Sequence, residues 1–305
     1  MGLYSSIPRG SNNFKHQISC SDVNDDFLYQ LFHLPHFIFI QKFYQFICFI
    51  LFLAPIKIFL VIISIVIWFL ISSCLKLFRS LFKTEIQFKT RSYEITKNIV
   101  RMFLFSLGVL RIDISGKQLL DARFLVSNHL SLLDYFIYYS QIPVTFIIKS
   151  DSPNSYEKFF TQGIVDIFYL QSKKRRFPSE QLDDCAQDPS YFPILLFPED
   201  VPTTGQAIAP FKKSAFYSEC PPQPIALKYN LWFTPNGFNS LFWDGKSIIG
   251  LIFRILAVPF MTVNITFLNP ERIKSRTLKP TEKAKSAQLQ IANELGIIAI
   301  SKTKN

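Results

Sequence analysis

The longest run of hydrophobic positions lies near the amino terminus, over residues 37–77. Pro55 and Lys57 divide this run, and a proline favours a break or kink in a helix. The part that follows, residues 58–75, would be roughly 27 Å long as a helix, against about 30 Å for the core of a bilayer. Two topologies fit the pattern: a single span over residues 58–75, or a kinked hairpin that enters and leaves by one face of the membrane.

The side of the membrane on which the rest of the chain lies is indicated by the charges that follow this run. They are Lys76, Arg79, Lys83, Lys89, Arg91, Lys97 and Arg101. Lysine and arginine are enriched on the cytosolic side of membrane segments. We therefore expect the main domain to be cytosolic. The run is too long, and starts too far from Met1, for a cleaved signal peptide.

After residue 90, short apolar stretches alternate with segments of helical spacing, which predicts an α/β fold. Strands are predicted over residues 109–114, 123–127, 143–148, 164–170, 193–197, 224–227 and 263–268. Helices are predicted over residues 92–107, 132–140, 156–162 and 284–295. We expect a polar loop or broken helix over 177–190, a helix that starts within 211–216, and an apolar stretch over 253–260 that could contact a membrane.

Composition narrows the classes of function. The chain has 305 residues, of which 49% are hydrophobic, and a formal net charge of +11. This charge indicates a lipid headgroup surface at least as readily as nucleic acid, for which no binding signature is present. The five cysteines show no CxxC spacing, which fits a reducing compartment. Since no ligands cluster at metal-binding spacing, no metal site is predicted.

Residues 128–134 carry the most informative polar pattern. His129 follows a predicted strand and is the only histidine beyond the hydrophobic run. Ser131 and Asp134 have the spacing of a capping box, which places Asp134 in the first turn of a helix and within reach of His129. A carboxylate that fixes the tautomer of an imidazole makes it a general base for a hydroxyl. The alternative is a polar strand-to-helix corner with a surface histidine.

Two further polar groups follow predicted strands. The basic run Lys173, Lys174, Arg175 and Arg176 comes after the strand 164–170. Such a run is usually a solvated loop, but the ends of strands in α/β sheets form ligand crevices, so phosphate contact is the sharper alternative. Glu199 ends another strand beside Pro198, where it could contact a substrate hydroxyl or simply belong to a turn.

The order of these features resembles the glycerolipid acyltransferase superfamily, which includes lysophosphatidate and glycerol-phosphate acyltransferases. Its first motif, Asn-His followed by four residues and Asp, matches residues 128–134. Its third motif begins Phe-Pro-Glu and matches residues 197–199. The resemblance covers roughly residues 90–270. It implies a mixed sheet flanked by helices, with catalytic His129 and Asp134.

The same resemblance implies substrate contacts and a mechanism. Glu199 would bind the acyl acceptor, and Lys173, Lys174, Arg175 and Arg176 would meet its phosphate. His129 would deprotonate the acceptor hydroxyl, which would then attack an acyl-CoA thioester. Acyl-CoA would be a co-substrate, and no bound cofactor or metal is expected.

Within the superfamily, the chain most resembles the ancient ubiquitous protein family of the endoplasmic reticulum and lipid droplets. The similar segments are residues 54–55, 126–129, 195–205, 258–260 and 293–296. The organisation expected from this resemblance is a polar tail over 1–36, a membrane hairpin or anchor over 37–82, an acyltransferase-like domain over 83–270, and an amphipathic helix with a tail over 271–305.

Two departures from these patterns concern function. Active acyltransferases continue the third motif as Gly-Thr-Arg, whereas this chain has Asp200, Val201 and Pro202. Loss of an arginine and gain of a carboxylate should weaken binding of an anionic phosphate. The ancient ubiquitous protein family also continues into modules that bind ubiquitin and recruit a ubiquitin-conjugating enzyme. Since this chain ends at Asn305, such recruitment is not expected.

Two functions are therefore expected. The first is an anchored protein of the endoplasmic reticulum membrane and lipid droplet, acting in droplet regulation or degradation of misfolded proteins, with residual acyl transfer. Its partners would be membrane lipids, the droplet monolayer and the degradation machinery. The alternative is an active acyl-CoA-dependent glycerolipid or lysophospholipid O-acyltransferase that uses His129 as its general base.

Overall fold

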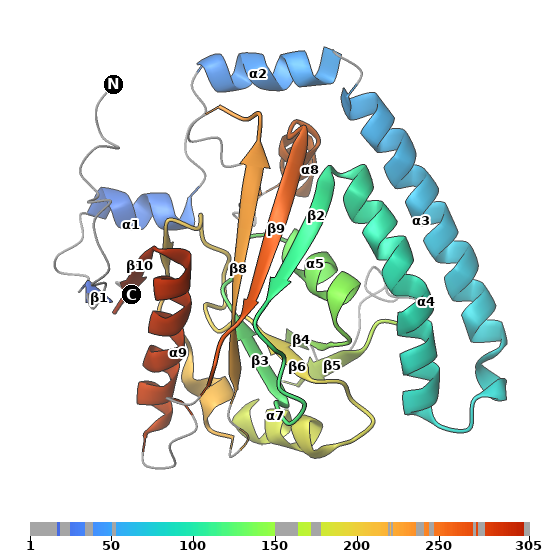
Figure 1. Cartoon of the computed structure of the whole chain (residues 1–305), viewed down its shortest axis with the longest axis vertical. Coiled ribbons are helices and arrows are strands. Elements are labelled where there is room, and N and C mark those ends of the chain that lie inside the picture. The colour runs from blue at the N-terminus through green and yellow to red at the C-terminus, as the bar shows by residue number, and fades with distance from the viewer. Residues whose placement is uncertain are drawn as a thin grey trace.

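The computed structural model describes residues 17–18, 25–33, 39–50, 53–149, 164–171, 178–218, 220, 222–235, 241–243, 247–270, 273 and 278–301. A seven-stranded sheet runs through its centre in the order β2-β9-β8-β3-β6-β4-β5 (Figure 1). The strands are β2 (Val109–Ser115), β3 (Phe124–Ser127), β4 (Thr145–Lys149), β5 (Ile167–Leu170), β6 (Ile194–Leu196), β8 (Gln223–Trp232) and β9 (Phe260–Phe267). A smaller parallel sheet joins β1 (Gln17–Ile18), β10 (Ile298–Ile300) and β7 (Ala207–Ile208).

The large sheet is mixed, as expected from the sequence. Neighbouring strands from β8 through β5 are parallel, whereas β9 runs antiparallel to β8 and β2 runs parallel to β9. Because β3 and β6 are parallel neighbours, the residues that follow them meet at one edge of the sheet. The fold therefore brings together residues 128–134 and 197–200.

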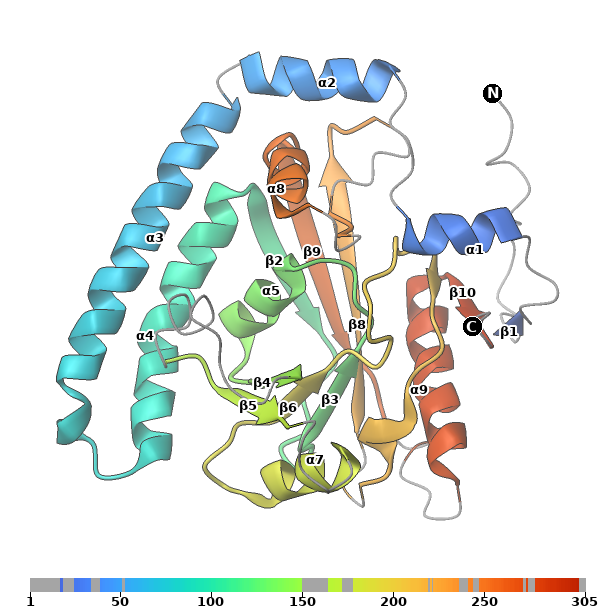
Figure 2. The same cartoon turned by 180° about the vertical axis from the view of Figure 1, so that it is seen from behind.

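Helices cover both faces of the sheet (Figures 1 and 2). Successive residues of β3 show the division: Leu125 packs with one face, and Phe124 and Val126 pack with the other. The first face is covered by α4 (Glu85–Ser106), α5 (Leu133–Gln141) and α8 (Ile248–Leu256). The second is covered by α7 (Pro178–Gln187), α9 (Pro280–Leu295) and the short 3-10 helix η3 (Lys213–Phe216). A further helix, α1 (Asp25–Phe32), packs on the small sheet.

The hydrophobic run forms α2 (Phe39–Ile50) and α3 (Leu53–Leu77), with α2 crossing near the amino-terminal end of α3 (Figure 1). Among the described residues, α3 is the one helix long and apolar enough to cross a membrane by length and composition, with a mean hydropathy of 2.9 in its most apolar window. It packs along α4, where Ser64 Oγ and Ser106 Oγ are 3.4 Å apart. A 3-10 turn, η2 (Arg79–Leu81), leads towards α4.

The hydrophobic run is divided close to Pro55, as expected from the sequence. Helix α2 ends at Ile50 and α3 begins at Leu53, with Pro55 in the first turn of α3. A first-turn residue has no intrahelical partner for its N–H, so a proline is tolerated there. The choice between a membrane hairpin and a single span, and the expected domain boundaries, stay predictions.

Several predicted elements differ in extent. Residues 178–187 form a regular helix, and the helix expected within 211–216 is only the 3-10 turn η3. The strand predicted over 224–227 is longer, because β8 continues to Trp232 as the partner of β9. Of residues 253–260, the first four end α8, residues 257–259 form a connection, and Phe260 begins β9. The helix predicted over 156–162 lies outside the described residues.

Candidate active site

His129 and Asp134 form the contact on which the site is built. His129 Nδ1 lies 2.8 Å from Asp134 Oδ2, and both residues are buried. A carboxylate accepts a hydrogen bond, so Nδ1 must carry the proton and Nε2 is left with its lone pair. Because His129 also lines a pocket, its imidazole is arranged as a general base.

Asp134 is held by the start of its own helix. Its Oδ2 also accepts hydrogen bonds from the backbone N–H groups of Leu130, at 2.7 Å, and Ser131, at 3.0 Å. Ser131 Oγ in turn accepts from the N–H of Leu133 at 3.3 Å. These bonds are close to the expected capping box, although Ser131 precedes the N-cap residue, Leu132. Three donors on one oxygen fix the orientation of the carboxylate.

Tyr229 contacts the other oxygen of Asp134. Its phenol, presented by β8, donates to Asp134 Oδ1 at 2.7 Å. Burial, together with the nearby Asp134 charge, raises the pKa of Tyr229 well above its ordinary value, which keeps the phenol protonated. The sequence does not predict this role of Tyr229, because a single tyrosine in a strand carries no local sign of such a partner.

Asn128 anchors the segment that carries His129. Its side-chain N–H donates to Leu227 O, and its Oδ1 accepts from Leu227 N, both at 2.9 Å. The amide thus copies the pairing of a strand and fixes residue 128 to β8. The Asn of the Asn-His pair therefore has a positioning role in this structure.

Glu199 supports His129 from behind the pocket. Its Oε1 accepts from His129 N and its Oε2 from Ala209 N, each at 2.8 Å. Burial raises the pKa of the Glu199 carboxyl to about 8, although the two backbone donors act to lower it. Glu199 is not among the residues that line the pocket. The predicted contact with an acceptor hydroxyl is untested, and the observed contacts are positional.

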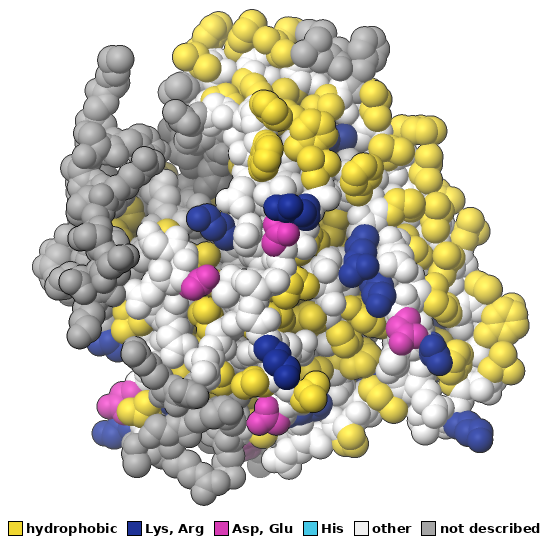
Figure 3. Space-filling view, viewed as in Figure 1, with side chains coloured by type: hydrophobic (Ala, Val, Ile, Leu, Met, Phe, Trp, Pro, Cys, Tyr) yellow, Lys and Arg dark blue, Asp and Glu magenta, His cyan; other side chains and the backbone are white. Residues whose placement is uncertain are grey.

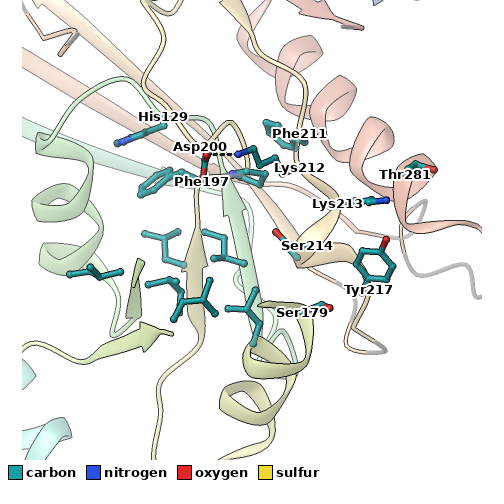
Figure 4. A pocket seen from close by; sticks show the side chains of 18 of the residues that line it. His129, Ser179, Phe197, Asp200, Phe211, Lys212, Lys213, Ser214, Tyr217 and Thr281 are labelled. Atoms are coloured by element: carbon teal, nitrogen blue, oxygen red, sulfur yellow. Dashed lines mark hydrogen bonds and ion pairs between the residues drawn. The ribbon is translucent and has the colours of Figure 1, made fainter. Parts of the chain in front are cut away.

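The pocket in front of His129 has a volume of about 1430 Å³, which exceeds the usual range for small-molecule sites (Figure 4). The ring of Phe197 stacks on the imidazole with centroids 4.3 Å apart and forms part of the wall. Much of the remaining lining is aliphatic: Ile147, Ile148, Leu170, Leu182, Leu195 and Leu196. An apolar cavity of this size can take up a hydrocarbon chain.

Charged side chains lie on another part of the lining. Asp200 forms an ion pair with Lys212, and Lys213 Nζ lies 5.7 Å from the ring centroid of Tyr217 (Figure 4). Asp200 has a φ of 68°, the left-handed conformation that glycine adopts most easily. This conformation gives a physical reason for the glycine of the Gly-Thr-Arg pattern. The sequence predicts only the start of a helix in the segment that contains the two lysines, so it does not identify them as site residues.

The predicted phosphate-binding run, Lys173, Lys174, Arg175 and Arg176, lies outside the described residues. The described residues on either side of it, Gln171 and Ser179, both line the pocket. A phosphate contact by this run stays a prediction.

Comparison with known proteins gives two kinds of similarity, and no family model matches the chain. Glycerol-3-phosphate acyltransferase 4 from Bos taurus is 23% identical over 179 residues, 56% of this chain and 36% of the relative. Glycerol-3-phosphate acyltransferase 3 from Xenopus laevis is 28% identical over 102 residues, 33% of this chain and 22% of the relative. The chain thus aligns with about a third or less of the length of these relatives.

The fold is shared with a solved structure, the 1-acyl-sn-glycerophosphate acyltransferase PlsC from Thermotoga maritima. The match has a TM-score of 0.50 and 16% identity, and covers 84% of this chain and 98% of PlsC. The chain is thus similar in sequence to glycerol-3-phosphate acyltransferases and shares the α/β fold of a solved acyltransferase structure.

Proposed function

We propose that the protein transfers an acyl group from acyl-CoA to a hydroxyl of a glycerolipid or lysophospholipid acceptor. The observation that carries this proposal is the 2.8 Å contact between His129 Nδ1 and Asp134 Oδ2 at the wall of a large, mainly apolar pocket. The similarity to glycerol-3-phosphate acyltransferases supports the reaction class. The aliphatic lining supports a long-chain acyl group.

The reaction follows from the orientation of the imidazole. Nε2 of His129 takes the proton of the acceptor hydroxyl, and the oxygen attacks the thioester carbonyl carbon. The resulting tetrahedral intermediate breaks its C–S bond, which gives the ester and a CoA thiolate. The thiolate then takes the proton from Nε2. Asp134 stabilises the imidazolium that forms between these steps.

A single assay tests this proposal. Purified, detergent-solubilised protein is incubated with a panel of acyl-CoAs and with lysophosphatidate, glycerol 3-phosphate and lysophosphatidylcholine. We expect an ester product that His129→Ala abolishes, whereas His33→Ala, a histidine on an exposed part of the chain, leaves turnover intact. The absence of turnover with every acceptor would refute the enzymatic function.

A second candidate is an interaction role at the endoplasmic reticulum membrane and lipid droplet, including the degradation of misfolded proteins. Asp200 at the pocket, in place of the usual glycine and near the missing arginine, favours this role. The location itself rests on the resemblance and on the apolar helix α3. Fluorescence microscopy of the tagged chain together with a neutral-lipid dye tests this location. If His129→Ala restored the droplet content of cells that lack the protein, the role would be independent of catalysis.

A further inference from the structure

Helix α8 has one face in the core and one face that is largely exposed. Leu251, Ile255 and Leu256 pack in the main hydrophobic core. Arg254 fixes the rotation of the helix, because its guanidinium donates to Phe242 O at 2.8 Å. The opposite face exposes Ile248, Ile249, Ile252 and Phe253, by between 48% and 69%.

At the same end of the sheet, β8 and β9 expose large aromatic side chains on the face opposite α8, because the neighbouring residues Leu231 and Met261 pack in the core under α8. Trp232, the last residue of β8, pairs in register with Phe260, the first residue of β9. Phe233 follows with a φ of 59°, an unfavourable conformation for an aromatic residue, and is 73% exposed. Three exposed aromatic side chains at one end of a sheet are unfavourable in water and are typical of a contact surface.

This surface continues towards the hydrophobic helices. The Lys57 ammonium, in α3, donates to the carbonyls of Leu107 and Val258, and Val258 lies just after α8. Helix α2 crosses nearby with its own exposed side chains, Phe39, Ile40, Phe43 and Phe46. Hydrophobic side chains accordingly gather at the α2 end of the molecule and continue along the α3 edge (Figure 3).

Continuity with α2 and α3 identifies the partner that this surface fits. The exposed side chains of α8 are uncharged, and the surface continues towards α3, which is long and apolar enough to cross a membrane. The acyl region of a lipid leaflet accepts exposed isoleucine and aromatic side chains. A leaflet that surrounds α3 would therefore also cover the exposed face of α8.

We propose that α8 and the ends of β8 and β9 form a second lipid-facing surface, which inserts beside α2 into one leaflet. The "α8 surface" is defined as Trp232, Phe233, Ile248, Ile249, Ile252, Phe253 and Phe260. It fixes how the domain lies on the membrane, whatever topology α3 adopts. The proposal does not depend on acyl transfer.

Trp232 is a native probe for this contact. Trp68→Phe and Trp243→Phe leave it as the only tryptophan, and the full chain is added to vesicles of phosphatidylcholine and phosphatidylinositol with brominated acyl chains. We expect a blue shift of the Trp232 emission and strong quenching by the bromine atoms. The matched control moves the tryptophan to Leu120, which is exposed beyond the opposite end of the sheet, through Trp232→Phe and Leu120→Trp. Its emission should not change.

A pair of substitutions tests the helix itself. Ile249→Glu with Ile252→Glu should weaken Trp232 quenching and lower vesicle partition by about tenfold, since two apolar contacts with lipid are lost. Leu120→Glu should change neither property. The proposal would be overturned if Trp232 were not quenched in protein that still floats with the vesicles. It would also be overturned if the protein were a dimer in detergent and the double substitution converted it to a monomer. Circular dichroism checks that the variants are folded. Acyl transfer measured in detergent tests the proposed enzymatic function separately from the lipid contact of the α8 surface.

Discussion

Tyr229 donates its phenolic hydrogen to Asp134 Oδ1 across 2.7 Å, on the oxygen opposite the one that accepts from His129. The carboxylate is therefore fixed from two elements, the first turn of α5 and the strand β8. The position of the His129 imidazole therefore depends on Tyr229, which lies outside the Asn-His motif.

Tyr229→Phe should lower kcat. Without the phenolic donor, Asp134 loses the contact that holds its Oδ1, so the carboxylate orients the imidazole of His129 less well. We expect kcat at neutral pH to fall by about tenfold. Tyr138→Phe is the control, because it removes a buried hydroxyl that bonds Ser127 Oγ at 2.7 Å. An equal fall of kcat in both variants would show a general effect of packing.

Asp134→Asn should separate the charge of the carboxylate from its geometry. The amide oxygen can take the place of Oδ2, and the amide N–H can donate to the Tyr229 oxygen. We therefore expect the melting temperature to stay close to that of the wild type, while kcat falls by about 100-fold or more. Thermal unfolding and turnover are measured on the same preparation. Full turnover in Asp134→Asn would exclude a catalytic role for this charge.

Glu199→Gln should reduce the loss of stability at alkaline pH. Burial raises the pKa of Glu199 from 4.5 to about 8, so the folded state binds a proton that the unfolded state releases. This contribution is complete below the unfolded pKa and is lost as the pH rises towards about 8. The wild type should lose stability over that range, and the variant should do so less steeply.

The absolute stability of Glu199→Gln should be lower at pH 5, because the amide cannot accept from both backbone N–H groups. Thermal unfolding in detergent between pH 5 and pH 8.5 gives both quantities. Parallel curves for the two proteins would contradict the assignment of a raised pKa to Glu199.

Asp200→Asn should favour anionic acceptors. Asparagine also tolerates the left-handed conformation of residue 200, and the substitution removes a carboxylate that pairs with Lys212 at the pocket. We expect KM for lysophosphatidate to fall by about threefold, an effect limited by the partial exposure of the pair. The KM for an uncharged monoacylglycerol is the control and should not change.

Lys57→Met should loosen α3 from the domain. The ammonium of Lys57 donates to carbonyls at the ends of α4 and α8, so the substitution leaves two buried acceptors without this donor. We expect a cost of about 2–3 kcal/mol and faster proteolysis between α3 and α4. Lys83→Met, at an exposed position in that connection, should leave the cleavage rate unchanged.

Local chemistry in the sequence was sufficient for several parts of the structure. The alternation of apolar strands and helices predicted the α/β fold and most strands of the large sheet. The Gly296 stop of the last helix was also predicted, and its φ of 67° shows the reason. The His129–Asp134 contact could be anticipated because it needs only a strand end and one helical turn.

Tertiary structure alone decided which distant residues complete the site. Tyr229, Glu199 and Lys212 reach the His129 region because β8 and β6 are the neighbours of β3, and sheet order is not encoded in local spacing. It also decided that Glu199 faces backbone N–H groups. Local spacing fixes contacts within one turn, whereas burial and strand order are set by the packing of the whole chain.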